Sequence, residues 1–241
     1  MPYKNRGIEI GTVCHVLNRG VDKRNIFMQE KDYIRFVHDL FEFNDERPAN
    51  DFNTFYFFQK YNSATDPSVI ARHYIDKKPR KRLVDILAFC LMPNHYHLML
   101  REKTVGGIVR FMKKLNMGYA RYFNEKYKRS GALFQGRYKS VLVTEQAHFT
   151  FLPYYIHLNP LDLVTPEWRE RSLRNFNKAW EFLNNYRWSS HLDYMGQKNF
   201  SSVTQHDFLT KFFEGPGQYQ KGIREWLQDL ELENMKEIIL E

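Results

Sequence analysis

The chain has 241 residues, of which 43% are hydrophobic and 16% are aromatic. This composition excludes a wholly disordered chain, because so many apolar side chains are enough to form a packed core. The formal net charge of +8 favours an anionic partner, and nucleic acid is the commonest one. A basic protein without such a partner is the alternative at this point.

Two cysteines, Cys14 and Cys90, lie in apolar runs that are typical of strands. Two scattered cysteines give no disulfide framework, so we expect buried free thiols in a reducing compartment. The first residues lack the apolar segment of a signal peptide, and no apolar run reaches the ~18 residues that span a membrane. The sequence therefore predicts a soluble, cytoplasmic protein with no membrane partner.

The first half of the chain predicts a strand, a helix and a hairpin. Residues 11–17 form an apolar run that ends in a turn, and residues 29–46 carry apolar side chains at helical spacing. Residues 47–82 are polar and irregular, and they are predicted to be a long inserted loop. Residues 83–91 are almost continuously apolar, as in a buried strand, and a Met-Pro-Asn turn joins them to an alternating strand at 95–101.

The second half predicts a helix, a strand and a further helix. Residues 104–127 form a long amphipathic helix, residues 133–143 form a strand, and residues 144–158 form a helix whose N-cap is Thr144. The element order predicts an α+β fold, with a ferredoxin-like antiparallel sheet and helices packed on it. Residues 161–241 are expected to be a mostly helical C-terminal extension that packs on this domain.

His95 and His97 flank Tyr96 in the second strand of the predicted hairpin. Side chains alternate along a strand, so the two imidazoles project from the same face of the sheet. Neutral imidazole is a common metal ligand, but a His-x-His pair on a strand is more often incidental. The position of this pair, at the start of a strand directly after a turn in an apolar hairpin, favours a functional role.

Five segments resemble the single-tyrosine transposases that carry the HUH motif (histidine, hydrophobic residue, histidine). They are most similar to the REP-associated tyrosine transposases, whose sequences contain MPNHxHL. The resemblance extends from about residue 10 to residue 196. The matching segments are VCHVLNRGVDKRNIF (13–27), AFCLMPNHYHLMLR (88–101), GALFQGRYKS (131–140), YIHLNP (155–160) and NYRWSSHLDYMG (185–196).

The resemblance implies a DNA strand-transferase whose catalytic domain is residues 1–160. The family's tyrosine, which matches Tyr155, would attack a phosphodiester of single-stranded DNA and leave a 5′-phosphotyrosine and a free 3′-OH. The resemblance also implies a divalent cation, Mg²⁺ or Mn²⁺, held by His95, His97 and Asn159, although imidazole alone would favour zinc. Asn159 lies one helical turn after Tyr155 on the same face, but it could equally cap the end of that helix.

Other tyrosines fit the role of nucleophile less well. Tyr154 is adjacent but points about a quarter turn away, and Tyr119 and Tyr122 belong to the apolar stripe of the long helix.

Pro153 lies inside the predicted tyrosine helix, where it removes a backbone hydrogen bond, so the helix could instead begin near this residue.

Basic residues in three regions are predicted to bind DNA, although a solvated basic surface is the alternative for some of them. By resemblance, the DNA would be a short hairpin with a flanking single-stranded tetranucleotide, and the protein a monomer or a homodimer. The rival functions are a non-catalytic nucleic-acid-binding protein with the same fold and a zinc-dependent hydrolase that uses the histidine pair. The predicted DNA contacts are Arg19, Lys23, Arg24, Arg110, Lys113, Lys114, Arg121, Lys128, Arg129, Arg137 and Lys139.

Overall fold

The computed structural model describes residues 9–47, 80–170, 173–205, 210–228 and 240. Most of the predicted inserted loop, residues 48–79, lies outside the described residues. No helix within the described ranges is both long enough and apolar enough to cross a membrane.

A four-stranded antiparallel sheet with the order β2-β3-β1-β4 forms the centre of the molecule. Its strands are β1 (Val13–Arg19), β2 (Val84–Met92), β3 (His95–Glu102) and β4 (Lys139–Leu142). Helices α1 (Glu30–Glu42) and α4 (Gly107–Lys126) complete the β1-α1-β2-β3-α4-β4 order. This order and topology confirm the predicted ferredoxin-like α+β fold.

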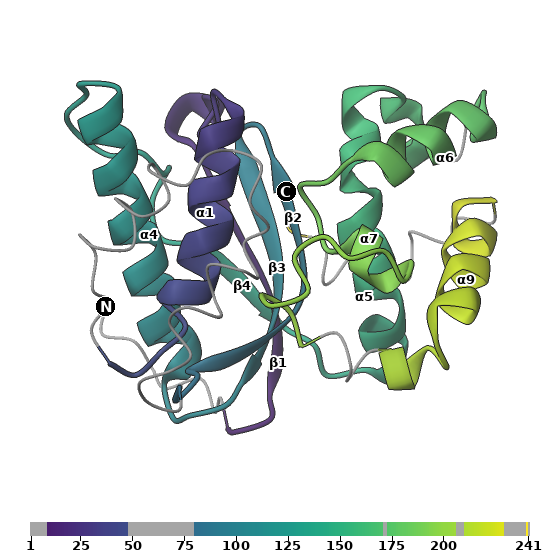
Figure 1. Ribbon diagram of the computed structural model, residues 1–241, viewed down its shortest axis with the longest axis horizontal. Coiled ribbons are helices and arrows are strands. Elements are labelled where there is room, and N and C mark those ends of the chain that lie inside the picture. Colours follow the sequence, from purple (N-terminus) through teal and green to yellow (C-terminus); the bar gives the residue numbers. More distant parts are fainter. Residues whose placement is uncertain (1–8, 48–79, 171–172, 206–209, 229–239, 241) are drawn as a thin grey trace.

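The sheet has a hydrophobic core on each face. Figure 1 shows α1 and α4 on one face, and α5 (Gln146–Leu158) with the helices that follow it on the other. Strand β2 is buried along its whole length because both of its faces are covered, which explains its continuous apolar sequence. The remaining described elements are η1 (Val21–Lys23), η2 (Asn159–Leu163), η3 (Pro166–Glu170), α6 (Phe176–Asn185), α7 (His191–Tyr194) and α9 (Pro216–Gln228).

Alternation along β3 decides which residues face α5. Tyr96, Leu98 and Leu100 belong to the core beneath α1 and α4, whereas Met99 belongs to the core beneath α5. His95 and His97 share the parity of Met99, so their imidazoles lie on the α5 side of the sheet.

Helix α5 runs through Pro153 and begins at Gln146, with Glu145 as its N-cap. The alternative that the helix begins near Pro153 is therefore wrong, and the predicted N-cap at Thr144 is one residue too early. Strand β4 is also shorter than the predicted strand at 133–143. Gly131 and Gly136 have φ values of 85° and 154°, and this backbone conformation interrupts a regular strand before Lys139.

The segment that follows α6 lies along the outer edge of β2. The backbone N–H of Leu91 donates to the carbonyl of Trp188 at 2.9 Å, and that of Phe89 donates to Ser190 Oγ at 2.9 Å. The Tyr194 hydroxyl donates to the carbonyl of Leu87 at 2.5 Å. The NYRWSSHLDYMG segment thus covers an edge strand and satisfies its polar groups.

The first turn of α4 passes very close to the start of β2 at Gly107. A Cβ atom at this position would lie 2.1 Å from the carbonyl oxygen of Leu83. We expect Gly107→Ala to lower the free energy of unfolding by about 1–3 kcal/mol, because backbone must shift to admit the methyl group. Urea unfolding measures the change.

Gly217, near the start of α9, provides the matched control. A Cβ atom there would meet nothing within 4 Å. Gly217→Ala is expected to leave stability unchanged or raise it by up to ~1 kcal/mol, because alanine reduces the freedom of the unfolded chain. Equal effects of the two substitutions would contradict the close approach at Gly107.

Candidate active site

The histidine pair lies at the start of β3, immediately after the turn at Pro93 and Asn94. The ring centroids of His95 and His97 are 5.0 Å apart, and the rings are nearly perpendicular. His95 is 8% exposed and His97 is 1% exposed. The imidazoles therefore form one cluster at the edge of the core beneath α5, with His97 deeper than His95.

A third histidine, His15 on β1, completes this cluster. Its Nε2 lies 2.9 Å from Nδ1 of His97, and the two rings stack with centroids 5.2 Å apart. His15 was not predicted as a site residue, although it lies in the VCHVLNRG segment. The contact depends on the pairing of Leu17 with His97, and this register places His15, two residues before Leu17, on the same face of the sheet.

Helix α5 places Tyr155 directly against the histidine cluster. The Tyr155 ring centroid is 5.9 Å from that of His97 and 6.0 Å from that of His15, with the ring edge-on to both. Tyr155 is fully buried. The adjacent Tyr154 points elsewhere, against Phe213 at a centroid distance of 5.1 Å.

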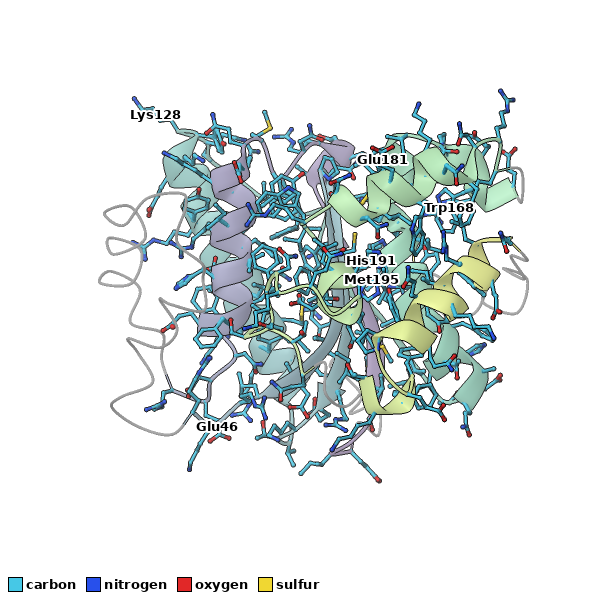
Figure 2. All side chains as sticks on the ribbon, turned by 45° about the vertical axis from the view of Figure 1, so that its right-hand side comes forward. Glu46, Lys128, Trp168, Glu181, His191 and Met195 are labelled. Atoms are coloured by element: carbon cyan, nitrogen blue, oxygen red, sulfur yellow. The ribbon has the colours of Figure 1, made fainter. Side chains whose placement is uncertain are left out.

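Arg169, on η3, covers Tyr155 from the side of the C-terminal extension. Its Nη1 donates to the Tyr155 hydroxyl at 3.3 Å, and its Nη2 donates to Asn159 Oδ1 at 3.1 Å. Two further bonds of 2.8 Å run from Arg169 to the carboxylate of Asp162. Trp168 donates to Asp162 at 2.6 Å. Figure 2 shows Trp168 on the opposite side of the molecule from Glu46 and Lys128.

Arg169 and Asp162 were also not predicted as site residues, because no motif marks them. They reach the site through the tight η2 and η3 turns after α5. Burial alone would lower the pKa of the Arg169 guanidinium, but the bonds to Asp162 and the nearby Tyr155 raise this pKa above its ordinary value. The guanidinium is therefore a fixed positive charge beside the phenol oxygen.

Asn159 is the C-cap residue of α5, which is the second of the two roles predicted for it from the sequence. Its Nδ2 donates to the Tyr155 carbonyl at 2.7 Å, and its Oδ1 accepts the bond from Arg169. Its role as a metal ligand stays a prediction. The structure brings Asn159, Tyr155, His95 and His97 to the same region.

The imidazoles of the pair are held in the neutral form. Burial, followed by the positive charges of Arg19 and Arg169, lowers the pKa of His95 to about 3. Burial and the neighbouring histidines lower the pKa of His97 well below its ordinary value. A neutral imidazole offers a lone pair to a metal ion at neutral pH. Within the described ranges, no group of three His, Cys, Asp or Glu side chains is arranged to hold a metal.

Several of the predicted DNA-binding residues lie on β1, on β4 or in the segments beside these strands. Arg19 is the register partner of His95, and the Asn94 side chain donates to the carbonyl of Lys23 at 3.1 Å. Gly20 forms a β-bridge with Phe134, so the loop after β1 lies beside the segment before β4. The exposed basic residues of these segments are Lys23, Arg24, Arg137 and Lys139. Exposed Lys128 and half-buried Arg129 follow α4, and Lys128 lies on the opposite side of the molecule from Trp168 (Figure 2).

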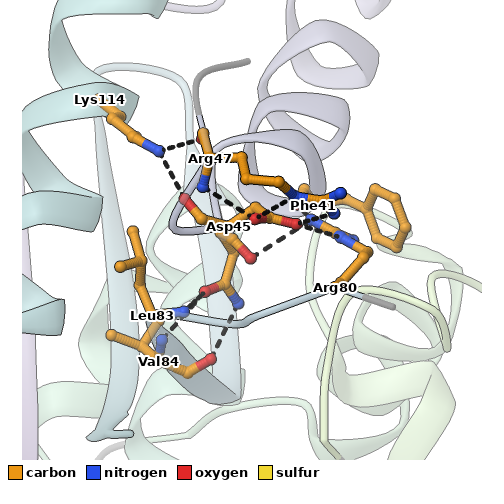
Figure 3. Close-up of polar contacts among 8 residues, drawn as sticks. Phe41, Asp45, Arg47, Arg80, Leu83, Val84 and Lys114 are labelled. Carbon is orange, nitrogen blue, oxygen red and sulfur yellow. Dashed lines mark hydrogen bonds and ion pairs between the residues drawn. The ribbon is translucent and has the colours of Figure 1, made fainter. Parts of the chain in front are cut away.

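The basic residues of α4 lie on the other side of the sheet, away from the histidine cluster (Figure 1). Lys114 donates to the carbonyls of Asp45 and Arg47 at 2.5 and 2.7 Å, and thereby fastens the segment that follows α1 (Figure 3). Arg110 lies 3.7 Å from Glu46, and Arg121 pairs with Glu125 at 2.8 Å. Lys113 is exposed. The structure does not bring these four residues to the histidine cluster, and their DNA contacts stay predictions.

Comparison with known proteins finds a similarity to a transposase family. Residues 59–159 match the family model described as "Transposase IS200 like", a stretch that contains both histidines and the tyrosine. One similar solved structure, "Structure of the REP associates tyrosine transposase bound to a REP hairpin", has a TM-score of 0.39 and 13% identity. The similarity covers 68% of this chain and 74% of that chain. Comparison with curated protein sequences finds no significant match.

Proposed function

We propose that this chain, whose residues 59–159 match the IS200-like transposase family model, cuts and rejoins single-stranded DNA through Tyr155. The family match supports a DNA-processing role and confirms the resemblance seen in the sequence. The finer proposal is a metal-dependent transesterase that acts at or near a DNA hairpin and forms a 5′-phosphotyrosine intermediate.

The observation that carries this proposal is the position of the Tyr155 phenol. It lies on a helix, yet its ring touches two imidazoles of the sheet and its hydroxyl contacts the Arg169 guanidinium. An unreactive core tyrosine needs only an apolar environment and one hydrogen-bond partner. A nucleophile, by contrast, needs positive charge beside the oxygen on which negative charge develops, and Arg169 supplies it.

In the proposed reaction, the Tyr155 oxygen bonds to phosphorus and the bond from phosphorus to the 3′ oxygen breaks. The phenol proton is lost to solvent, and the departing 3′ oxygen gains a proton to become a 3′-OH. The covalent bond keeps the phosphate activated, so a 3′-OH can later attack it and restore a phosphodiester. Arg169 would stabilise the charge that develops on the phenol and phosphate oxygens.

The residues present fit a divalent cation such as Mg²⁺ or Mn²⁺ that is shared between protein and substrate. Mg²⁺ commonly takes few protein ligands and fills its remaining positions with phosphate oxygens and water. Two neutral imidazoles, with Asn159 as the proposed third ligand, match that pattern. When bound, the cation would neutralise the phosphate oxygens and polarise phosphorus.

DNA can reach Tyr155 only if Arg169 and Trp168 move, because the phenol is fully buried. The Arg169 side chain is 23% exposed and its partner Asp162 is 27% exposed, so their ion pair lies at the surface above the phenol. A phosphate could replace the Asp162 carboxylate on the guanidinium, since both groups accept two parallel hydrogen bonds. The basic residues near His95 would guide the strand to this point.

The test is to incubate the protein with a labelled hairpin oligonucleotide that carries a single-stranded flank and Mg²⁺ or Mn²⁺. We expect a covalent protein–DNA adduct on a denaturing gel, and peptide mass spectrometry should place the nucleotide on Tyr155. Binding without an adduct would support a non-catalytic nucleic-acid-binding protein. If the protein cleaves the strand without forming an adduct, and if cleavage is lost in EDTA and returns when zinc is added, the result would support a zinc-dependent hydrolase.

A further inference from the structure

We propose that Asn94 and His15 are positioning residues, which fix the tautomers of His95 and His97 so that each presents the Nε2 lone pair as its donor atom. The proposal rests on the proposed function only in assigning a metal to these lone pairs. The tautomer of His95 follows from its hydrogen bond to Asn94, whereas that of His97 follows from its hydrogen bond to His15 together with the assigned metal, and both can be measured without metal or DNA.

Asn94 determines the tautomer of His95. Its Oδ1 lies 2.5 Å from Nδ1 of His95, and its Nδ2 donates to the carbonyl of Lys23 at 3.1 Å. The second bond fixes the orientation of the amide, because a reversed amide would place two oxygen acceptors against each other. An amide oxygen only accepts, so Nδ1 of His95 must carry the proton, and in a neutral ring Nε2 then carries the lone pair.

His15 is the corresponding partner of His97. Its Nε2 lies 2.9 Å from Nδ1 of His97, and in a pair of neutral imidazoles one nitrogen donates while the other accepts. When His97 donates through Nδ1, its Nε2 carries the lone pair. The reverse arrangement would put a proton on Nε2 of His97 and leave that nitrogen unable to bind a cation. Histidines that bind metals commonly donate their second ring nitrogen to such a partner.

Burial explains why the site needs these partners. His15 and His97 are almost completely buried, and a buried polar ring without a hydrogen bond is costly. The bond between them satisfies one nitrogen of each ring and also limits rotation of the His97 ring. The Asn94 bond does the same for His95, which lies nearer the surface.

Long-range ¹H–¹⁵N NMR spectra of the metal-free full chain, labelled at histidine nitrogens, test the tautomers directly. We expect the Nδ1–H form for both His95 and His97, with single-histidine variants providing the assignments. The Nε2–H form at either ring would overturn the proposal for that ring. This measurement uses the wild-type chain, so it stands even if a variant fails to fold.

Two substitutions at residue 15 separate positioning from simple packing. Glutamine can place an acceptor oxygen where Nε2 of His15 lies, whereas leucine fills space without accepting. We expect His15→Leu to weaken Mn²⁺ binding about 10- to 100-fold in calorimetric titrations, and His15→Gln to change it by less than about threefold. Hairpin affinity in EDTA should be the same in both variants, which controls for folding.

Mn²⁺ binding by His15→Leu at wild-type strength would contradict the positioning role. A different outcome bears on the proposed function alone. If the wild-type chain shows both expected tautomers and binds Mn²⁺, yet forms no adduct with hairpin DNA, the inference holds and the proposed strand transfer fails.

Discussion

Tyr155→Phe is expected to abolish the covalent protein–DNA adduct, with a loss of at least about 10⁴-fold in its rate of formation. Phenylalanine keeps the ring that packs edge-on against His97 and His15, but it lacks the oxygen that attacks phosphorus. Arg169 retains its bonds to Asp162 and Asn159, so the covering segment should stay in place. A time course with labelled hairpin DNA and Mn²⁺ on a denaturing gel measures the rate.

Tyr154→Phe is the matched control, because it removes a hydroxyl from the neighbouring residue of the same helix. The Tyr154 ring packs against Phe213 and Tyr219, away from the histidines. Adduct formation should therefore remain within about twofold of wild type, and hairpin affinity should be unchanged in both variants. An adduct that persists in Tyr155→Phe and disappears in Tyr154→Phe would reverse the assignment of the nucleophile.

Local periodicity explains the parts of the fold and site that could be predicted. Alternation along a strand is a property of neighbouring residues, so it places His95 and His97 on one face without knowledge of the rest of the chain. Helical spacing relates Tyr155 to Asn159 in the same way. The order of strands and helices was also enough to predict the ferredoxin-like sheet, because few sheet topologies accommodate that order.

The residues that sequence analysis missed depend on contacts between distant parts of the chain. His15 meets His97 across 82 positions of sequence, and only the exact register of β1 against β3 brings them together. Arg169 approaches Tyr155 through two short 3-10 helices, whose path no hydrophobic pattern specifies. Gly136 is a third case that the sequence pattern did not predict. Its φ of 154° interrupts residues 133–143, which otherwise look like one strand, and the regular strand begins only at Lys139.

The free energy of unfolding is expected to fall as the pH is lowered from 7 to 5, and two buried histidines that hold the C-terminal extension to α5 contribute to this loss. His157 and His191 both bond to the Tyr219 hydroxyl, at 2.7 and 2.9 Å. Their other ring nitrogens meet Ser190 Oγ at 2.7 Å and Asn184 Oδ1 at 3.3 Å, so no hydrogen-bond partner is charged. The Tyr194 ring also packs against His157.

The sign of the effect follows from the pKa values. Burial, and then proximity to His191, lowers the pKa of His157, while burial lowers that of His191 to about 4. In the unfolded chain both residues have a pKa near 6.5, so above that pH neither state binds a proton and stability is fully present. Between about pH 6.5 and 4 the unfolded state binds more protons, and each histidine costs about 1.4 kcal/mol per pH unit.

From pH 7 to pH 5 the two histidines together should therefore lower stability by about 4 kcal/mol, a large part of the ~5–15 kcal/mol that stabilises a typical domain. Buried His95 and His97 act in the same direction in the metal-free protein. Urea unfolding at the two pH values measures the total.

His191→Asn can keep an acceptor towards Tyr219 but cannot titrate. The difference in the free energy of unfolding between pH 7 and pH 5 should therefore shrink by about 2 kcal/mol, whatever the variant costs at pH 7. An unchanged difference would show that His191 binds protons equally in the folded and unfolded chain over this pH range, so that burial does not keep it neutral.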